Sequence, residues 1–251
     1  MSNAPRRLAV VPAYNEEPTI IAVLEQLSPL VTDLTIVDDG STDGTRAKVQ
    51  AWLPDHPHVR LLSFDRNRGM SAAYYLAFTD IARRMQGGEL SPNDLVFTVD
   101  ADGQHDLEEF EALERIVLDE HLDALLAERD LSDYPWVKRA GNRVMSTWAT
   151  LWAGQPLRDV ESGYRVFRIG ALCDALQYYR GWKYSETVEV AVVLCRLGYR
   201  VRNDVPVPVP IFRSRTSYFD AAVDICAIPL AAGRLWWRRS RRTRRAPASA
   251  G

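Results

Sequence analysis

The sequence predicts an α/β fold, a single Rossmann-like domain with a mostly parallel sheet and helices on both of its faces. Short apolar runs alternate with helical patterns through the first half of the chain, which is typical of strand–helix–strand units. Such units connect in a right-handed sense and cover the sheet with helices. The length of 251 residues suits one large domain with a short appendage.

The expected elements follow one another in chain order. Short runs rich in Val, Ile and Leu predict strands at residues 8–11, 34–37, 59–64, 95–99 and 122–127. Apolar residues that recur every three or four positions predict helices at residues 20–27, 43–53, 70–85, 107–119, 138–152 and 186–197. A last strand is expected at 199–205, and because the alternating prolines that follow cannot donate ladder hydrogen bonds, it should lie at an edge.

Charge is distributed unevenly along the chain. The formal net charge is −2, but seven arginines and no acid lie between Arg234 and Arg245, so the rest of the chain has 24 basic against 33 acidic residues. We therefore divide the chain into a main domain at residues 1–218 and a short amphipathic, basic C-terminal segment at residues 219–251.

Cysteine usage and hydropathy exclude several classes of protein. Cys173, Cys195 and Cys226 form an odd, widely spaced set, which disfavours a disulfide framework or a structural zinc site and favours a reducing compartment. The best candidate for a membrane span, residues 221–233, is shorter than the ~20 residues that a helix needs to cross a bilayer. We expect a cytoplasmic protein that meets a membrane only from one side.

Polar clusters follow two of the expected strands in the first part of the chain. Residues 12–17 include Glu16 and Glu17, which could simply open a helix, but that leaves Tyr14 unexplained. Asp38 and Asp39 are adjacent carboxylates, which repel each other unless a cation or a ribose hydroxyl shares them. Helix capping accounts for one of the residues after Asp39, not for all of them. These strand ends are candidate ligand contacts, because ligands bind at the carboxyl ends of parallel strands.

The fourth expected strand ends in two carboxylates with one residue between them. Asp100 and Asp102 can both turn toward a ligand there, and Gln104 and His105 follow directly. Carboxylate oxygens suit a hard divalent cation such as Mg²⁺ or Mn²⁺, which keeps few protein ligands and fills its other positions with water and phosphate oxygens. The segment therefore predicts a metal–phosphate site.

Taken together, these segments resemble the family 2 glycosyltransferases, enzymes of the GT-A fold, and most of all their polyprenyl-phosphate (dolichyl-phosphate mannose synthase-like) branch. The three strand ends match that family in order and spacing, and the resemblance covers about residues 8–218. Residues 67–73 are similar to its Asn-x-Gly-x-x-x-Ala segment, and residues 159–165 to its Asp-x-x-Ser-Gly-aromatic-Arg segment. At residues 213–218 the chain lacks the glycine and lysine that the family usually has, although Arg215 can supply the cation.

The resemblance implies a role for each matching residue. The nucleoside pocket would be lined by Pro12, Ala13, Tyr14 and Glu16, with Asp39 holding the base or the ribose. The metal and the donor diphosphate would be held by Asp100, Asp102 and Gln104. The phosphates of donor and acceptor would be met by Arg129, Arg143 and Arg213.

The activity implied is a metal-dependent, inverting transfer of a sugar from a GDP- or UDP-sugar to a polyprenyl phosphate. A phosphate monoester is already anionic and needs cations rather than a general base, and the chain supplies arginines in excess. The alternative is a soluble hydroxyl acceptor, which would require a base near the attacking oxygen. A nonenzymatic sugar-nucleotide binder would have no need of the metal-binding acids. A nucleotidyltransferase would show a glycine-rich basic loop after the first strand, and residues 12–17 are not of that kind.

The C-terminal segment fits a lipid-linked acceptor. Residues 225–232 are apolar, Trp236 and Trp237 favour a membrane–water interface, and the arginines can meet anionic headgroups. We expect this segment to bind a membrane surface at the cytoplasmic face and to bind no nucleic acid. A purely solvated tail is the competing interpretation.

Overall fold

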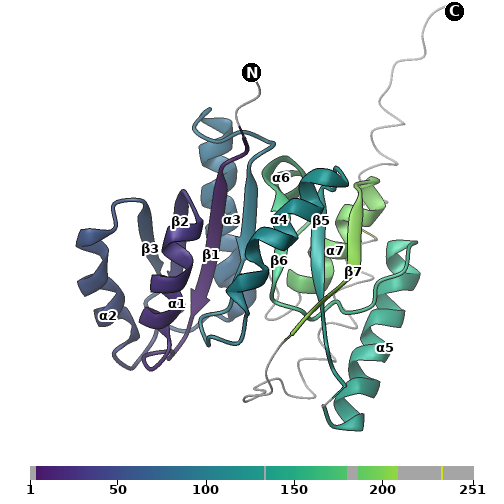
Figure 1. Cartoon of the computed structure of the whole chain (residues 1–251), viewed down its shortest axis with the longest axis horizontal. Coiled ribbons are helices and arrows are strands. Elements are labelled where there is room, and N and C mark those ends of the chain that lie inside the picture. The colour runs from purple at the N-terminus through teal and green to yellow at the C-terminus, as the bar shows by residue number, and fades with distance from the viewer. Residues whose placement is uncertain (1–3, 133, 180–185, 209–232, 234–251) are drawn as a thin grey trace, which may run out of the picture.

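Seven strands form one sheet in the described part of the chain, which in this computed structural model comprises residues 4–132, 134–179, 186–208 and 233 (Figure 1). The strands are β1 (Arg7–Ala13), β2 (Asp33–Asp38), β3 (Val59–Ser63), β4 (Leu95–Thr98), β5 (Ala124–Arg129), β6 (Arg165–Arg168) and β7 (Val201–Val207). Their order is β3-β2-β1-β4-β6-β5-β7. All neighbours are parallel except those of β6, which runs antiparallel to both β4 and β5.

Helices cover both faces of this sheet. They are α1 (Ile20–Leu27), α2 (Thr45–Trp52), α3 (Met70–Gln86), α4 (Phe110–Asp119), α5 (Trp136–Ala153), α6 (Ile169–Leu176) and α7 (Glu186–Leu197), with short 3-10 turns at Ser28–Leu30, Leu53–Asp55 and Leu107–Glu109. One apolar core joins the sheet to α1, α2 and α4, and the other joins it to α3, α5, α6 and α7. Alternate residues of β1 supply the two cores, Val10 to one and Val11 to the other, because successive strand side chains point to opposite faces.

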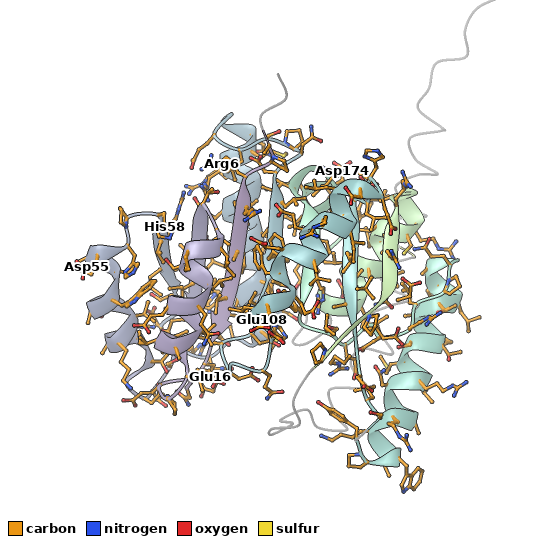
Figure 2. All side chains as sticks on the ribbon, viewed as in Figure 1. Arg6, Glu16, Asp55, His58, Glu108 and Asp174 are labelled. Carbon is orange, nitrogen blue, oxygen red and sulfur yellow. The ribbon has the colours of Figure 1, made fainter. Side chains whose placement is uncertain are left out.

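The chain reverses its direction of sheet growth at β1. It moves from β1 outward through β2 to β3, then returns to place β4 on the other side of β1. The crevice at such a switch point, at the carboxyl ends of the strands, is the usual ligand site of an open α/β sheet. In Figure 2, Glu16 and Glu108 lie at that end of the sheet, whereas Arg6 and Asp174 lie at the opposite end.

The predicted fold class is confirmed, with one strand and one helix that the pattern did not reveal. Residues 165–168, of which only Arg165 belongs to the 159–165 motif, form β6, and α6 follows directly. Strand β6 has only four residues, and the polar Arg165 at its start interrupts the apolar run that would have marked it. The edge position expected for the last strand is confirmed for β7. None of the helices in the described ranges is both long and apolar enough to cross a bilayer.

Candidate active site

The loops after β1 and β2 are tied to each other by hydrogen bonds. The backbone N–H of Asn15 donates to Ser41 Oγ (3.0 Å), and the N–H of Thr42 donates to Asn15 Oδ1 (2.8 Å). The N–H of Glu16 donates to Thr45 Oγ1 (2.9 Å) at the start of α2. Asn15 adopts a left-handed backbone with φ of 55°, which asparagine tolerates better than most residues. Several of the polar residues after these strands therefore build the loops, and Tyr14 between them is left exposed.

The two adjacent carboxylates at the end of β2, Asp38 and Asp39, have separate partners. Asp38 is buried and pairs with Arg46 of α2, with 2.6 Å between its Oδ2 and Arg46 Nε. Asp39 is 3% exposed, and its two oxygens accept hydrogen bonds from the backbone N–H groups of Arg68 (2.7 Å) and Gly69 (2.8 Å), just before α3. Burial raises the pKa of Asp39 despite these two donors. Of the pair, only Asp39 remains a candidate ligand contact.

Gly40 makes the approach of these two segments possible. A Cβ at this position would lie 2.3 Å from the backbone carbon of Arg66, and φ is +70°. Both the space and the backbone conformation therefore require glycine. The β2 loop can then reach the residues before α3, where Asp39 accepts its two hydrogen bonds.

The loop after β4 joins the same group. Thr19 Oγ1, at the start of α1, donates to the backbone oxygen of Ala101 (2.9 Å). Because the β1 loop also bonds to the β2 loop, the loops after all three strands meet at one edge of the sheet. Asp102 lies half-buried there, and one of its oxygens accepts from the N–H of Gln104 (3.0 Å). These hydrogen bonds join the loops after β2 and β4 through the segment after β1.

Asp100 is held from two sides. Its backbone N–H donates to Nδ1 of His105 (3.2 Å), which leaves the ring hydrogen on Nε2, 3.3 Å from Asp100 Oδ2. The His105 ring stacks on Tyr164, with ring centroids 4.9 Å apart and planes 9° apart. On another side Gly163 lies so close that a Cβ there would be 2.3 Å from Asp100 Oδ2. The Ser162–Gly163–Tyr164 segment therefore supports Asp100 rather than forming a separate site.

The electrostatics around Asp100 favour a carboxylate. Burial opposes ionisation, but the His105 ring, with smaller contributions from Arg165 and Arg129, outweighs it and lowers the pKa of Asp100. Burial raises the pKa of Tyr164, and Asp106 and Glu109 add to that effect. The tyrosine next to the site therefore stays neutral and serves as a packing surface for His105.

The residues around Asp100 and Asp102 fit a divalent cation. Asp100 Oδ1 is buried and has no hydrogen-bond partner among the described residues, which is costly for a carboxylate oxygen unless a cation reaches it. Two carboxylates with the amide of Gln104 are a hard oxygen donor set of the kind that Mg²⁺ and Mn²⁺ prefer. The described residues contain no cluster of three or more His, Cys, Asp and Glu side chains placed to hold a metal, so phosphate or water oxygens would complete the coordination.

Arg129, at the end of β5, is fixed in a tight ion pair. Its Nε and Nη2 bond to the two oxygens of Asp159 at 2.7 and 3.0 Å, and Nη2 also lies 3.5 Å from Glu161 Oε2. Burial lowers the pKa of Arg129, but Asp159 and Glu161 outweigh it and raise the value well above the ordinary one. With 22% of its side chain exposed, Arg129 is a permanent cation at the edge of the site.

A residue that the sequence interpretation missed holds Asp159 in place. Asn203 of β7 is buried and accepts from the N–H groups of Arg158 (2.6 Å) and Asp159 (3.0 Å) through Oδ1. Its amide donates to the backbone oxygens of Leu126 (2.9 Å) and Asp159 (3.0 Å). A single asparagine in a predicted strand gives no sequence signal for this role, because its partners are distant in the chain.

The remaining predicted residues lie in different places. Pro12 and Ala13 are buried at the end of β1, and Glu16 and Gln104 are half-buried in the adjacent loops. Arg143 is exposed on α5, outside the hydrogen-bonded network formed by the described residues of the site. Arg213 and the C-terminal segment at 219–251, apart from Gly233, lie outside the described residues.

Comparison with known proteins identifies the family of the chain. Residues 8–172 match the sequence profile of glycosyl transferase family 2. This chain belongs to that family. It is therefore a glycosyltransferase, and the matched region contains the strand-end loops, Asp100, Asp102, Arg129 and the Asp159–Tyr164 segment.

Two sequence relatives and one solved structure show which members of the family the chain is similar to. The chain is 29% identical over 179 residues to the polyprenol monophosphomannose synthase of Mycolicibacterium smegmatis, a match that covers 65% of this chain and 62% of that protein. It is 28% identical over 215 residues to the undecaprenyl-phosphate mannosyltransferase of Micrococcus luteus, covering 81% and 82%. Among solved structures, glucosyl-3-phosphoglycerate synthase of Mycobacterium tuberculosis has the same fold, with a TM-score of 0.67, 20% identity and coverage of 92% and 80%.

Proposed function

We propose that this glycosyltransferase transfers a sugar from a GDP- or UDP-sugar to a polyprenyl phosphate, with inversion at the anomeric carbon. The names of the two sequence relatives, which act on polyprenol and undecaprenyl phosphate, support the acceptor class. The observation that carries the proposal is the site around Asp100, with its orphaned oxygen, beside the fixed cation Arg129. We assign catalysis to residues 1–218 and membrane attachment to residues 219–251.

The donor is assigned to the loops after β1 and β2. Pro12, Ala13, Tyr14 and Glu16 are proposed to line the nucleoside pocket, with Asp39 facing the base or the ribose. Both Asp39 oxygens already accept one backbone N–H, but a carboxylate oxygen has a second lone pair for a ligand donor. Thr19, in the segment after β1, is hydrogen-bonded to Ala101 of the β4 loop, so the diphosphate of a donor bound at these loops would extend toward Asp100 and Asp102.

Asp100, Asp102 and Gln104 are proposed to hold a divalent metal, Mg²⁺ or Mn²⁺, together with the donor diphosphate. When bound, that ion supplies positive charge to a leaving diphosphate. The structural neighbour from Mycobacterium tuberculosis is described with Mn²⁺ and UDP-glucose, which is consistent with this assignment. His105 and Gly163 orient Asp100 so that one of its oxygens is available to the ion.

The acceptor phosphate is assigned to Arg129, Arg143 and Arg213. Arg129 supplies a charge that does not titrate near neutral pH, and Arg143 and Arg213 are proposed to join it. An acceptor phosphate oxygen is already a nucleophile, so the site has to position it and screen its repulsion from the diphosphate. No general base is then needed, in contrast to a hydroxyl acceptor. We place the reaction at the cytoplasmic face of a membrane.

Transfer of labelled sugar tests the proposal. Purified full-length protein is incubated with Mn²⁺, a short-chain polyprenyl phosphate in detergent, and radiolabelled GDP-mannose or UDP-glucose. We expect metal-dependent label in the organic phase with one donor. Asp102→Asn should lower the rate by at least about 100-fold, and Asp119→Asn, an exposed residue at the end of α4, is the matched control that should leave it unchanged. Label that remains in the aqueous phase with every donor refutes the lipid acceptor, and transfer to an added soluble sugar supports the hydroxyl alternative.

A further inference from the structure

We propose that Glu161 competes with the acceptor phosphate for Arg129 and thereby excludes small free phosphates from the site. The inference rests on the proposed function, in which Arg129 meets the acceptor phosphate. It makes Glu161 a specificity residue, because an incoming anion has to displace its carboxylate or protonate it. The argument for this competition comes from the hydrogen bonds and charges around the guanidinium of Arg129.

Most of the hydrogen-bonding capacity of Arg129 is already used. A guanidinium has five N–H donors, one on Nε and two on each Nη. Nε and one hydrogen of Nη2 bond side-on to the two oxygens of Asp159, at 2.7 and 3.0 Å. The second hydrogen of Nη2 is left for Glu161 Oε2, 3.5 Å from the nitrogen. Among the residues that the structure describes, Nη1 has no hydrogen-bond partner.

This pattern determines how a phosphate can bind to Arg129. Arginine holds a phosphate best through two parallel N–H groups. The side-on pair is filled by Asp159, which leaves the end-on pair formed by Nη1 and Nη2. Glu161 accepts from Nη2 at that end. A two-point contact between Arg129 and a phosphate therefore requires Glu161 to release Nη2.

Glu161 is held more loosely than Asp159. Its side chain is 31% exposed, against 1% for that of Asp159. Its 3.5 Å contact with Arg129 is longer than a strong charge-assisted hydrogen bond, which measures about 2.8 Å. The backbone of Glu161 is fixed separately, because its N–H donates to Asp159 Oδ1 (3.1 Å). The carboxylate of Glu161 can therefore move aside while the Arg129–Asp159 pair stays intact.

The charges around Glu161 oppose the binding of a further anion. Asp159 balances Arg129, so an ionised Glu161 leaves one negative charge unbalanced among the three side chains. Burial raises the pKa of Glu161 and outweighs the opposing charges of Arg129 and of Lys138 in the first turn of α5. The charge of Asp159 adds to the rise in this pKa. An approaching phosphate favours the protonated acid further, because like charges disfavour ionisation.

The cost of displacing Glu161 matters most for small anions. It is the same for every phosphate that uses Nη1 and Nη2 of Arg129, but inorganic phosphate has no other part to bind. A polyprenyl phosphate can offset the cost by burying its apolar chain. Glu161 therefore reserves Arg129 for a phosphate that is attached to an apolar chain.

Inhibition by inorganic phosphate tests the inference with the full-length protein. Glu161→Gln keeps the size of the side chain and removes its charge. The matched control is Glu128→Gln, because Glu128 lies near the end of β5, is 30% exposed and is 3.6 Å from Arg158 Nη1. Circular dichroism and thermal unfolding confirm that each variant folds. The transfer assay with Mn²⁺ then gives the inhibition constant of inorganic phosphate and the KM of a short-chain polyprenyl phosphate.

We expect Glu161→Gln to lower both constants at neutral pH by at least about fivefold, with kcat changed by less than about twofold. Glu128→Gln should behave like the unaltered chain. The difference between Glu161→Gln and the unaltered chain should shrink as the pH falls toward about 5, because Glu161 with its raised pKa becomes protonated. The second ionisation of the phosphate affects both proteins equally and cancels in this comparison.

Unchanged constants in Glu161→Gln overturn the inference. A higher KM or a markedly lower kcat also overturns it, because Glu161 then assists the acceptor or acts as a base. Thermal unfolding in inorganic phosphate, with no donor present, separates this inference from the proposed function. If the unaltered chain transfers no sugar to polyprenyl phosphate, the proposed function fails. Phosphate should still stabilise Glu161→Gln more than the unaltered chain, and equal stabilisation of the two overturns the competition at Arg129.

Discussion

Replacing Gly163 by alanine should specifically displace the carboxylate of Asp100. The new Cβ would lie 2.3 Å from Asp100 Oδ2 and 2.9 Å from its Cγ, whereas ordinary contacts begin near 3.4 Å. The carboxylate must therefore move by about 1 Å, since packed side chains resist such overlap. Gly163 is not among the glycines with positive φ, so the alanine backbone itself is tolerated. The perturbation is confined to the space that Asp100 occupies.

The magnitude follows from what that movement breaks. The contact between His105 Nε2 and Asp100 Oδ2 is already 3.3 Å long, so a shift of about 1 Å away from the ring takes it beyond hydrogen-bond reach. Loss of such support around a metal ligand typically lowers metal affinity by about 10- to 100-fold. The overpacking itself should lower the free energy of unfolding by about 1–3 kcal/mol.

Calorimetric titration of Mn²⁺ into protein saturated with UDP or GDP measures the affinity, and urea unfolding measures the stability. Gly141→Ala is the matched control, because Gly141 lies within α5 and a Cβ at this position would meet nothing within 4 Å. It should leave metal affinity unchanged and stabilise the helix by up to about 1 kcal/mol. If Gly163→Ala binds Mn²⁺ as the unaltered protein does, Asp100 is not positioned by this contact and the reasoning about the site is wrong.

Other changes test the rest of the network. His105→Phe keeps a ring against Tyr164 but removes both nitrogens, so titration should show Mn²⁺ affinity about tenfold weaker at nearly unchanged melting temperature; equal affinity would contradict this. Asp159→Ala leaves Arg129 without its main partner and should cost about 3–5 kcal/mol in urea unfolding, and a loss below 1 kcal/mol would mean the pair is dispensable. Asn203→Ala removes four hydrogen bonds of a buried amide and should lower the free energy of unfolding by at least about 2 kcal/mol, as measured by equilibrium urea unfolding. The pKa of Asp100 is lower in the folded state than in the unfolded state. The ionised carboxylate therefore stabilises the fold at pH values above the unfolded pKa of about 3.9. This stabilisation is lost as the pH falls through the folded-state pKa. The difference in unfolding free energy between the unaltered protein and Asp100→Asn should therefore shrink below pH ~4, and a difference that grows there would contradict the assigned direction.

Much of the first half of the fold, from β1 to β4, could be predicted from the sequence because the patterns that indicate it are local. Strands β1 to β4 are apolar runs, and the acids that follow them lie at the carboxyl edge, where parallel strands must bring them together. The position of Asp39 at the end of β2 could be predicted, but not its two hydrogen bonds to the residues before α3, because these depend on a close approach that Gly40 permits.

The support around Asp100 could not be predicted, because it comes from distant parts of the chain. Strand β6 is short and begins with a buried arginine, so neither length nor alternation identifies it. Its antiparallel direction is what brings Gly163 and Tyr164 to the end of β4. Sequence patterns contain the residues of that motif, but only the strand pairing shows that they surround a carboxylate 63 positions earlier. Asn203 is a similar case, since its partners belong to two other segments, β5 and the loop that contains Asp159.

The reversal of strand direction at β6 also separates the segment between β5 and β6 from the strands of the sheet. The chain leaves the sheet at Arg129 and re-enters it at Arg165, and Asp159, six residues before the re-entry, is bonded to Arg129 at the exit. The segment between them, which includes α5, begins and ends at the same edge of the sheet. A segment anchored in this way can be altered or replaced during evolution without rebuilding strands β1 to β4, so one scaffold can present different surfaces beside the same strand-end loops.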